Sequence, residues 1–166
     1  MKNFKTILWG DILYNQYNND YCYHDYYQNE YYKTLLQDLE EYIQDELQDS
    51  FYYQELAKSA PTNFARDIIL EFSKDEKMHA QRFQEVYYMI TGSYFTPKPL
   101  KPVVITDYED SLKQRVLAET KDYGKYGEQY LKAPNKYLRD LFFRTRTVEA
   151  QHAMRISILF EEEAED

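Results

Sequence analysis

The sequence is poor in cysteine, glycine and basic charge, and each shortage argues against a class of protein. A single cysteine, Cys22, allows neither an internal disulfide nor a four-thiolate metal site. Four glycines among 166 residues favour helices over a turn-rich sheet protein. Twenty lysines and arginines against 29 acidic residues leave a formal charge of −9, without the clustered basic face that nucleic-acid binding needs.

Long hydrophobic runs are missing as well. No stretch approaches the ~20 apolar residues of a membrane-spanning helix, so we expect no membrane partner. The opening MKNFKTILWGDIL has a short apolar run and no small-residue cleavage site, so we expect no secretory signal. Together with the scarcity of cysteine, this favours a cytoplasmic location.

Tyrosine is the residue in excess, with 19 copies, and many lie near the start of the chain. Residues 1–30 are rich in Asn and Tyr and lack helical periodicity, so we interpret them as an N-terminal arm before a domain at 31–166. Aromatic residues are enriched at interfaces, which favours a packing or assembly role for the arm. A homodimer is the simplest assembly consistent with it.

The remainder of the chain shows long helical stretches separated by three breaks, at 59–61, 92–102 and 133–135. The middle break contains three prolines and predicts an extended connector. An all-α fold follows, a four-helix bundle with a long crossover between its second and third helices. The expected helices span 31–58, 63–91, 107–132 and 136–162.

Each expected helix carries an apolar stripe at three- and four-residue steps, the pattern of a bundle helix. Near the middle of every helix, acidic residues or a carboxylate–imidazole pair interrupt the stripe where leucine would be expected. A buried, unpaired carboxylate costs several kcal/mol, so a compensating charge is predicted. The interrupting residues are Glu46, Glu76 with His79, Glu119, and Glu149 with His152.

The two halves of the bundle are copies of one helical hairpin. A shift of 73 residues places Glu46 on Glu119 and Glu76 on Glu149 without a gap. Within each hairpin the two glutamates lie fifteen residues from the turn proline, on opposite sides of it. In antiparallel helices this puts them at equal height, about 22 Å from the turn. The connector is long enough to run the length of the bundle, which brings both acidic layers to one level.

Four glutamates and two histidines at one level form a metal-ligand set. Each Glu-x-x-His presents an oxygen and an imidazole nitrogen on the same helix face. Two divalent cations would balance the four negative charges. Carboxylate and imidazole ligands without thiolates suit iron or manganese better than structural zinc.

With these motifs the sequence resembles the ferritin-like di-metal carboxylate superfamily, over about residues 31–162. It looks most similar to the rubrerythrin branch, through the segment Glu46-Leu-Gln-Asp-Ser-Phe-Tyr-Tyr53 and through Asp-Glu76-Lys-Met-His79-Ala. The resemblance implies a ferritin-like bundle with a non-haem centre of two Fe ions, or alternatively two Mn ions. It implies Glu76 and Glu149 as bridging ligands, and Glu46, His79, Glu119 and His152 as terminal ones.

The same resemblance implies an oxidoreductase that reduces hydrogen peroxide or dioxygen. Typical rubrerythrins end in a four-cysteine rubredoxin domain, which is missing from this sequence, so electrons would come from an external donor protein. Rubrerythrins also place an extra Glu three residues after the third-helix ligand, where this chain has Asp122. The shorter side chain puts the family's redox-linked ligand exchange in doubt.

Four further residues are candidates around the site. Tyr53 and Tyr126 lie two turns beyond Glu46 and Glu119, and could donate hydrogen bonds that orient a ligand carboxylate or could be core tyrosines. Asp49 and Asp122 are left as extra ligands, partners for the outer histidine nitrogens, or solvated ends of the stripe.

Three other functions remain open at this stage. A ferroxidase or iron-storage protein would use the same centre inside a cage. Manganese catalase chemistry would evolve oxygen from peroxide without a reductant. A structural, coat-associated protein would use the metal only to stabilise the bundle, with the Tyr-rich arm as its assembly element.

Overall fold

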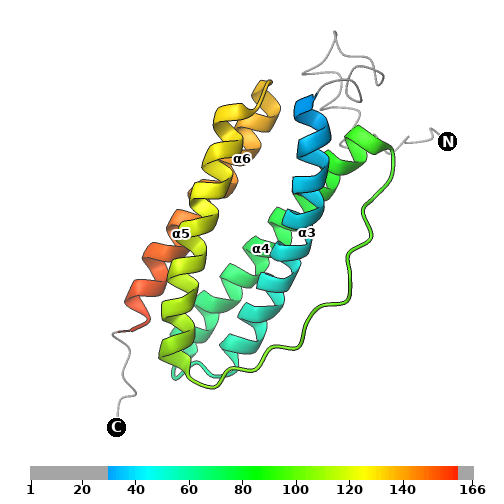
Figure 1. Ribbon diagram of the computed structural model, residues 1–166. Coiled ribbons are helices and arrows are strands. Elements are labelled where there is room, and N and C mark those ends of the chain that lie inside the picture. The colour runs from blue at the N-terminus through cyan, green and yellow to red at the C-terminus, as the bar shows by residue number, and fades with distance from the viewer. Residues whose placement is uncertain (1–29, 161–166) are drawn as a thin grey trace, which may run out of the picture.

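The computed structural model describes residues 30–160 and shows a four-helix bundle, as predicted (Figure 1). The helices are α3 (Glu30–Ala57), α4 (Asn63–Thr91), α5 (Tyr108–Lys132) and α6 (Lys136–Ile158). Helix α3 packs against α4 and α5 against α6, so the chain forms two antiparallel hairpins. The predicted arm at 1–30 lies almost wholly outside the described residues.

The helix ends follow the capping residues in the sequence. Helices α4, α5 and α6 begin after Thr62, Asp107 and Asn135, whose side chains each accept a hydrogen bond from the backbone N–H three residues on. Helix α4 ends at Gly92, which takes the left-handed conformation at φ 75°. Three of the four predicted helices therefore have boundaries within one residue of those expected.

Helix α6 is the exception, since it ends at Ile158 rather than at the expected 162. The Leu159 N–H donates to the Ile156 carbonyl at 3.0 Å, which closes the helix with a tightened turn. The sequence continues with three glutamates. Negative charge at a helix C-terminus opposes the helix dipole, which explains the earlier end.

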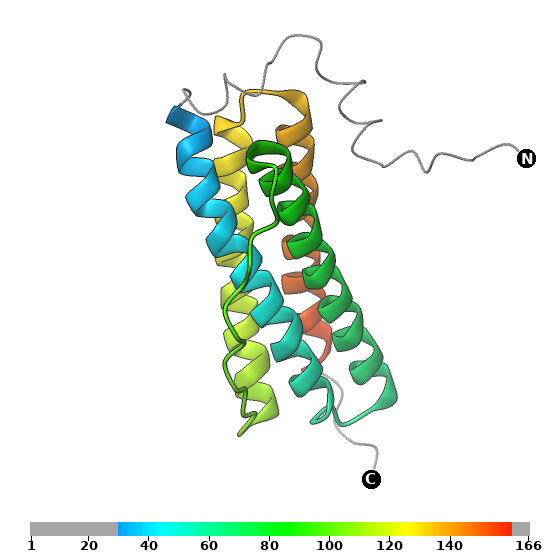
Figure 2. The same ribbon diagram turned by 90° about the vertical axis from the view of Figure 1, so that its right-hand side faces the viewer.

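The connector at 92–107 runs the length of the bundle alongside α3, as Figure 2 shows. Gln48 holds it by accepting from Lys101 N–H at 2.8 Å and donating to the Lys101 carbonyl at 3.1 Å. Gln44 accepts from Lys98 N–H at 2.7 Å. The crossover therefore returns the chain to the end where α3 finishes, and α5 starts level with the first hairpin's turn, as predicted.

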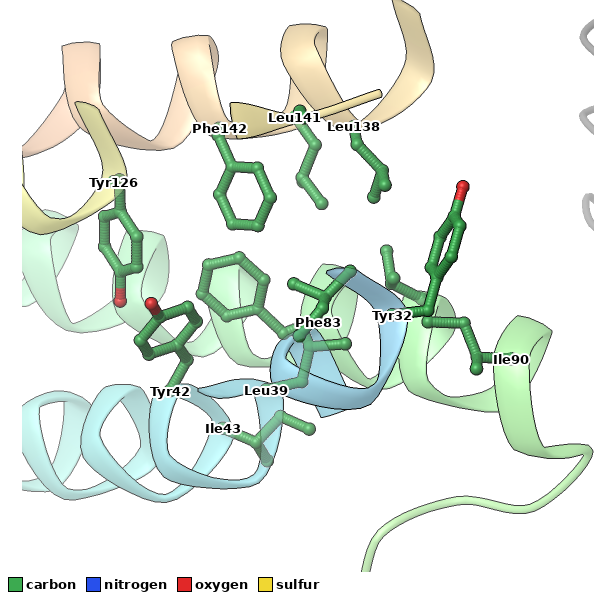
Figure 3. Close-up of a cluster of buried hydrophobic side chains, with 13 residues drawn as sticks. Tyr32, Leu39, Tyr42, Ile43, Phe83, Ile90, Tyr126, Leu138, Leu141 and Phe142 are labelled. Atoms are coloured by element: carbon green, nitrogen blue, oxygen red, sulfur yellow. The ribbon is translucent and has the colours of Figure 1, made fainter. Parts of the chain in front are cut away.

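Two apolar clusters fill the bundle, one toward each end. The first contains Phe83 and Phe142, whose ring centroids lie 6.1 Å apart, together with Tyr42 and Tyr126 (Figure 3). The second is built around Phe72 and other fully buried side chains nearer the hairpin turn of α3 and α4. The acidic residues of the four helices occupy the level between the clusters. Of the described helices, none is long and apolar enough to cross a membrane.

Candidate metal centre

The six predicted ligands lie together in the bundle interior. Each helix contributes from its middle, and each residue is at most 4% exposed; the six are Glu46, Glu76, His79, Glu119, Glu149 and His152. Burial to this degree is exceptional for carboxylates unless a positive charge or a metal compensates them. The register derived from the turn prolines therefore corresponds to the three-dimensional arrangement.

One group of four potential ligand atoms consists of the Nδ1 atom of His79 and three carboxylate oxygens around it. The Glu46 Oε2 atom lies 3.3 Å from this nitrogen, and Glu76 Oε2 lies 3.1 Å from it. Glu149 Oε1 reaches it from the other hairpin, also at 3.1 Å. Three helices thus supply three oxygens and one nitrogen to a single small volume.

A second group of four surrounds the Nδ1 atom of His152. Here Glu76 Oε1 lies at 3.1 Å, Glu119 Oε2 at 3.3 Å and Glu149 Oε2 at 3.4 Å. In each group one donor atom per residue lies within 4.8 Å of all the others. The two groups have the same composition, and the 73-residue repeat explains why.

Glu76 and Glu149 belong to both groups, with one carboxylate oxygen directed into each. Of these four oxygens, Glu76 Oε1 and both Glu149 oxygens lie 3.1–3.4 Å from a histidine Nδ1 atom but form no hydrogen bond with any described residue. Buried carboxylate oxygens without a hydrogen bond fit ligation by cations. Each of these two overlapping groups could hold a metal ion.

The two tyrosines cross between the hairpins. Tyr53 of α3 donates its hydroxyl to Glu119 Oε1 of α5 at 2.5 Å. Tyr126 of α5 donates in turn to Glu46 Oε1 of α3 through a short hydrogen bond. Each donor engages the oxygen that does not face the histidine. Glu46 and Glu119 therefore each have one oxygen, the one that faces a histidine Nδ1 atom, to offer a cation.

Asp49 and Asp122 take a role outside the alternatives considered from the sequence, because each pairs with a cationic side chain. Asp49 accepts two hydrogen bonds from the Arg115 guanidinium, at 2.9 and 2.8 Å. Asp122 lies 2.6 Å from the Lys125 ammonium. Neither aspartate belongs to a group of ligand atoms.

The outer nitrogens of the two histidines have different surroundings. His152 Nε2 lies 3.2 Å from Asp75 Oδ2, an arrangement that fixes the ring and directs Nδ1 inward. Among the described residues, His79 Nε2 is buried without a hydrogen-bond partner. The 73-residue repeat aligns Asp75 with Val148, so a valine takes the place of the aspartate that would support His79. The two halves of the centre are therefore similar in their ligands but not in the residues that support them.

Without a bound cation, the surroundings of Glu46 disfavour its charged form. Burial, reinforced by the charge of Glu76, raises the pKa of the Glu46 carboxyl to about 8. Burial would raise the pKa of Glu119 too, but the hydrogen bond from His152 and the charge of Arg115 outweigh it and lower the pKa to about 2. Burial alone would lower the pKa of His79, yet its three carboxylate neighbours raise it. Cation binding at this site should therefore release protons.

These shifts predict that the cation-free protein loses stability as the pH rises from 5.5 to 8. Between its ordinary pKa of 4.5 and its folded pKa of about 8, Glu46 holds more proton in the folded state than in the unfolded state. The raised pKa of His79 acts in the same direction above its ordinary value of 6.5. Urea unfolding with a chelator present at both pH values checks this. Equal stability at the two pH values would contradict it, and Glu46→Gln should flatten the difference.

Sequence reasoning missed three supporting residues: Arg115, Lys125 and Asp75. Arg115 and Lys125 lie between α3 and α5. The Arg115 Cζ atom is 4.8 Å from the centroid of the Tyr53 ring, and the Lys125 Nζ atom is 4.7 Å from the centroid of the Tyr126 ring. The sequence did contain a signal for Arg115, because it falls on the apolar stripe of its helix. A buried arginine there needs a buried acidic partner. Asp75 directly precedes the Glu-x-x-His motif of α4, but its partner is His152 of α6, 77 residues away. No local sequence pattern reveals that contact.

Comparison with known proteins identifies no relative: no family model, no curated protein and no solved structure matches this chain.

Proposed function

We propose that this chain is a rubrerythrin-like non-haem di-iron oxidoreductase that reduces hydrogen peroxide or dioxygen. The observation that carries the proposal is the sharing of Glu76 and Glu149 between two buried donor groups. Each group offers three oxygens and one imidazole nitrogen, a donor set that suits iron or manganese.

The chain's own residues supply positioning and exclusion of bulk water. Glu76 and Glu149 would hold the two cations at a fixed separation, and the burial of the site limits solvent around them. Tyr53 and Tyr126 keep Glu119 and Glu46 oriented by donating to their second oxygens. When bound, iron supplies the redox chemistry, in which two electrons and two protons convert one peroxide into two waters.

Electrons for repeated turnover would come from an external electron-donor protein, which is part of the proposal. The given residues contain one cysteine, Cys22, whereas a rubredoxin-type iron site needs four. The net charge of −9 favours a donor with a basic surface, since complementary charge steers association.

The test is metal content followed by peroxide turnover on protein purified without chelators. We expect two iron atoms per chain, and peroxide consumption that requires an added reductant at two electrons per peroxide. Glu149→Gln should abolish turnover, while the exposed Glu85→Gln on α4 should leave it unchanged. Absence of both iron and manganese would overturn the proposal. Oxygen release from peroxide without reductant by the manganese form would replace it with catalase chemistry.

A further inference from the structure

Arg115 is a buried cation that contacts one terminal ligand of the centre. It is 7% exposed, and its guanidinium forms two hydrogen bonds to Asp49. The Nη2 atom also donates to Glu119 Oε1 at 2.5 Å. A buried charge is screened far less than a surface charge, so its effect on the adjacent ligand is strong.

Glu119 consequently has only its Oε2 atom to offer a cation. Its Oε1 atom accepts from both Arg115 and Tyr53, each at 2.5 Å. Its Oε2 atom faces His152 Nδ1 at 3.3 Å. Part of the negative charge of Glu119 is therefore already balanced by the protein, and a cation bound beside Glu119 and His152 would be near a fixed positive charge.

Glu46, the corresponding ligand of the other hairpin, forms no ion pair with a lysine or arginine among residues 30–160. Its Oε1 atom accepts from the neutral hydroxyl of Tyr126. Lys125 is close by, but it pairs with Asp122 at 2.6 Å and lies 4.7 Å from the centroid of the Tyr126 ring. The repeat places Tyr42 at the position equivalent to Arg115, so the arginine is specific to one half of the centre.

We propose that Arg115 makes the two cation positions unequal, so that the position of Glu46 and His79 fills first and the position of Glu119 and His152 binds its cation more weakly. This inference rests on the proposed di-metal centre. Asp75 acts in the opposite direction through His152, but its side chain is 33% exposed and it does not touch a carboxylate ligand. Arg115 is buried and touches Glu119 directly, so its charge dominates.

Two substitutions should shift the weaker binding step in opposite directions. Arg115→Gln removes the positive charge beside Glu119 and leaves the Tyr53 hydrogen bond to Oε1 in place, so the weaker step should tighten by about tenfold, which corresponds to ~1.4 kcal/mol. Asp49→Asn removes the counter-charge of Arg115, so the weaker step should become weaker still. Arg115→Lys retains the charge and should retain two separate steps. A purely structural role would predict weaker binding for Arg115→Gln.

The experiment is calorimetric titration of the full chain with Mn²⁺, after chelation and with folding checked by circular dichroism. Lys113→Gln is the matched control, because it removes a charge of the same sign from an exposed side chain of the same helix, α5, and both steps should stay unchanged. Wild-type steps of equal affinity, or an Arg115→Gln protein whose second step is unchanged or weaker, would overturn the inference and leave the di-metal proposal standing. If Arg115→Gln does not fold, an unchanged or tighter second step in Asp49→Asn would overturn it. Wild-type protein that binds no cation would instead overturn the proposed function.

Discussion

Chelation of a cation from the proposed centre should lower the free energy of unfolding by about 4 kcal/mol per cation, relative to protein in cation at a thousand times the dissociation constant of that site. The folded state places four glutamates at one level of the interior, whereas the unfolded chain does not assemble the site. Cation binding therefore acts almost wholly on the folded state. Without it, the buried carboxylates depend on protonation and on two histidines for compensation.

Thermal or urea unfolding with Mn²⁺ and with a chelator measures this difference. A Glu76→Gln, Glu149→Gln double variant serves as the control, because it should bind no cation and should unfold identically under both conditions. Wild-type protein that is equally stable with and without cations would contradict the prediction. In that case the acidic layer would be compensated by its own protons and ion pairs alone.

Substitution of a bridging glutamate should affect both cations, whereas substitution of a terminal glutamate should affect one. Glu76 and Glu149 each provide an oxygen to both groups, while Glu46 and Glu119 provide one to a single group. Glu76→Gln should therefore reduce the bound metal from two ions per chain to nearly none. Glu46→Gln should leave about one, since the second group keeps all four of its donors.

Metal content after gel filtration, measured on both variants alongside Glu85→Gln, checks this prediction. The control lies on the exposed face of α4 and should bind as the wild type does. Equal losses for Glu76→Gln and Glu46→Gln would show that the donors do not divide into two overlapping groups.

The fold could be predicted from the sequence because its signals are local and repeated. The prolines at 61 and 134 mark the two hairpin turns, and equal spacing from them sets the level of the glutamates. The length of the connector then determines how the hairpins stand relative to each other. Each of these steps uses only chain geometry, which is why the six buried residues were found together.

The residues that support the ligands were harder to predict because their contacts cross between hairpins. Tyr53 and Tyr126 were candidates, but the exchange of partners between α3 and α5 depends on how the two hairpins pack. Asp49 and Asp122 were left as extra ligands, partners for the outer histidine nitrogens or solvated ends of the stripe, yet they form ion pairs with Arg115 and Lys125. Since both cations lie on α5 at positions unrelated by the repeat, the internal symmetry gave no indication of these pairs.

The most direct test of the central claim is a crystal structure of the full chain grown with Mn²⁺, with anomalous scattering recorded for the metal. We predict two peaks about 3.5–4 Å apart, one beside Glu46 and His79 and the other beside Glu119 and His152, with Glu76 and Glu149 between them. A bundle with the six side chains in place and no anomalous peak among them would contradict the claim.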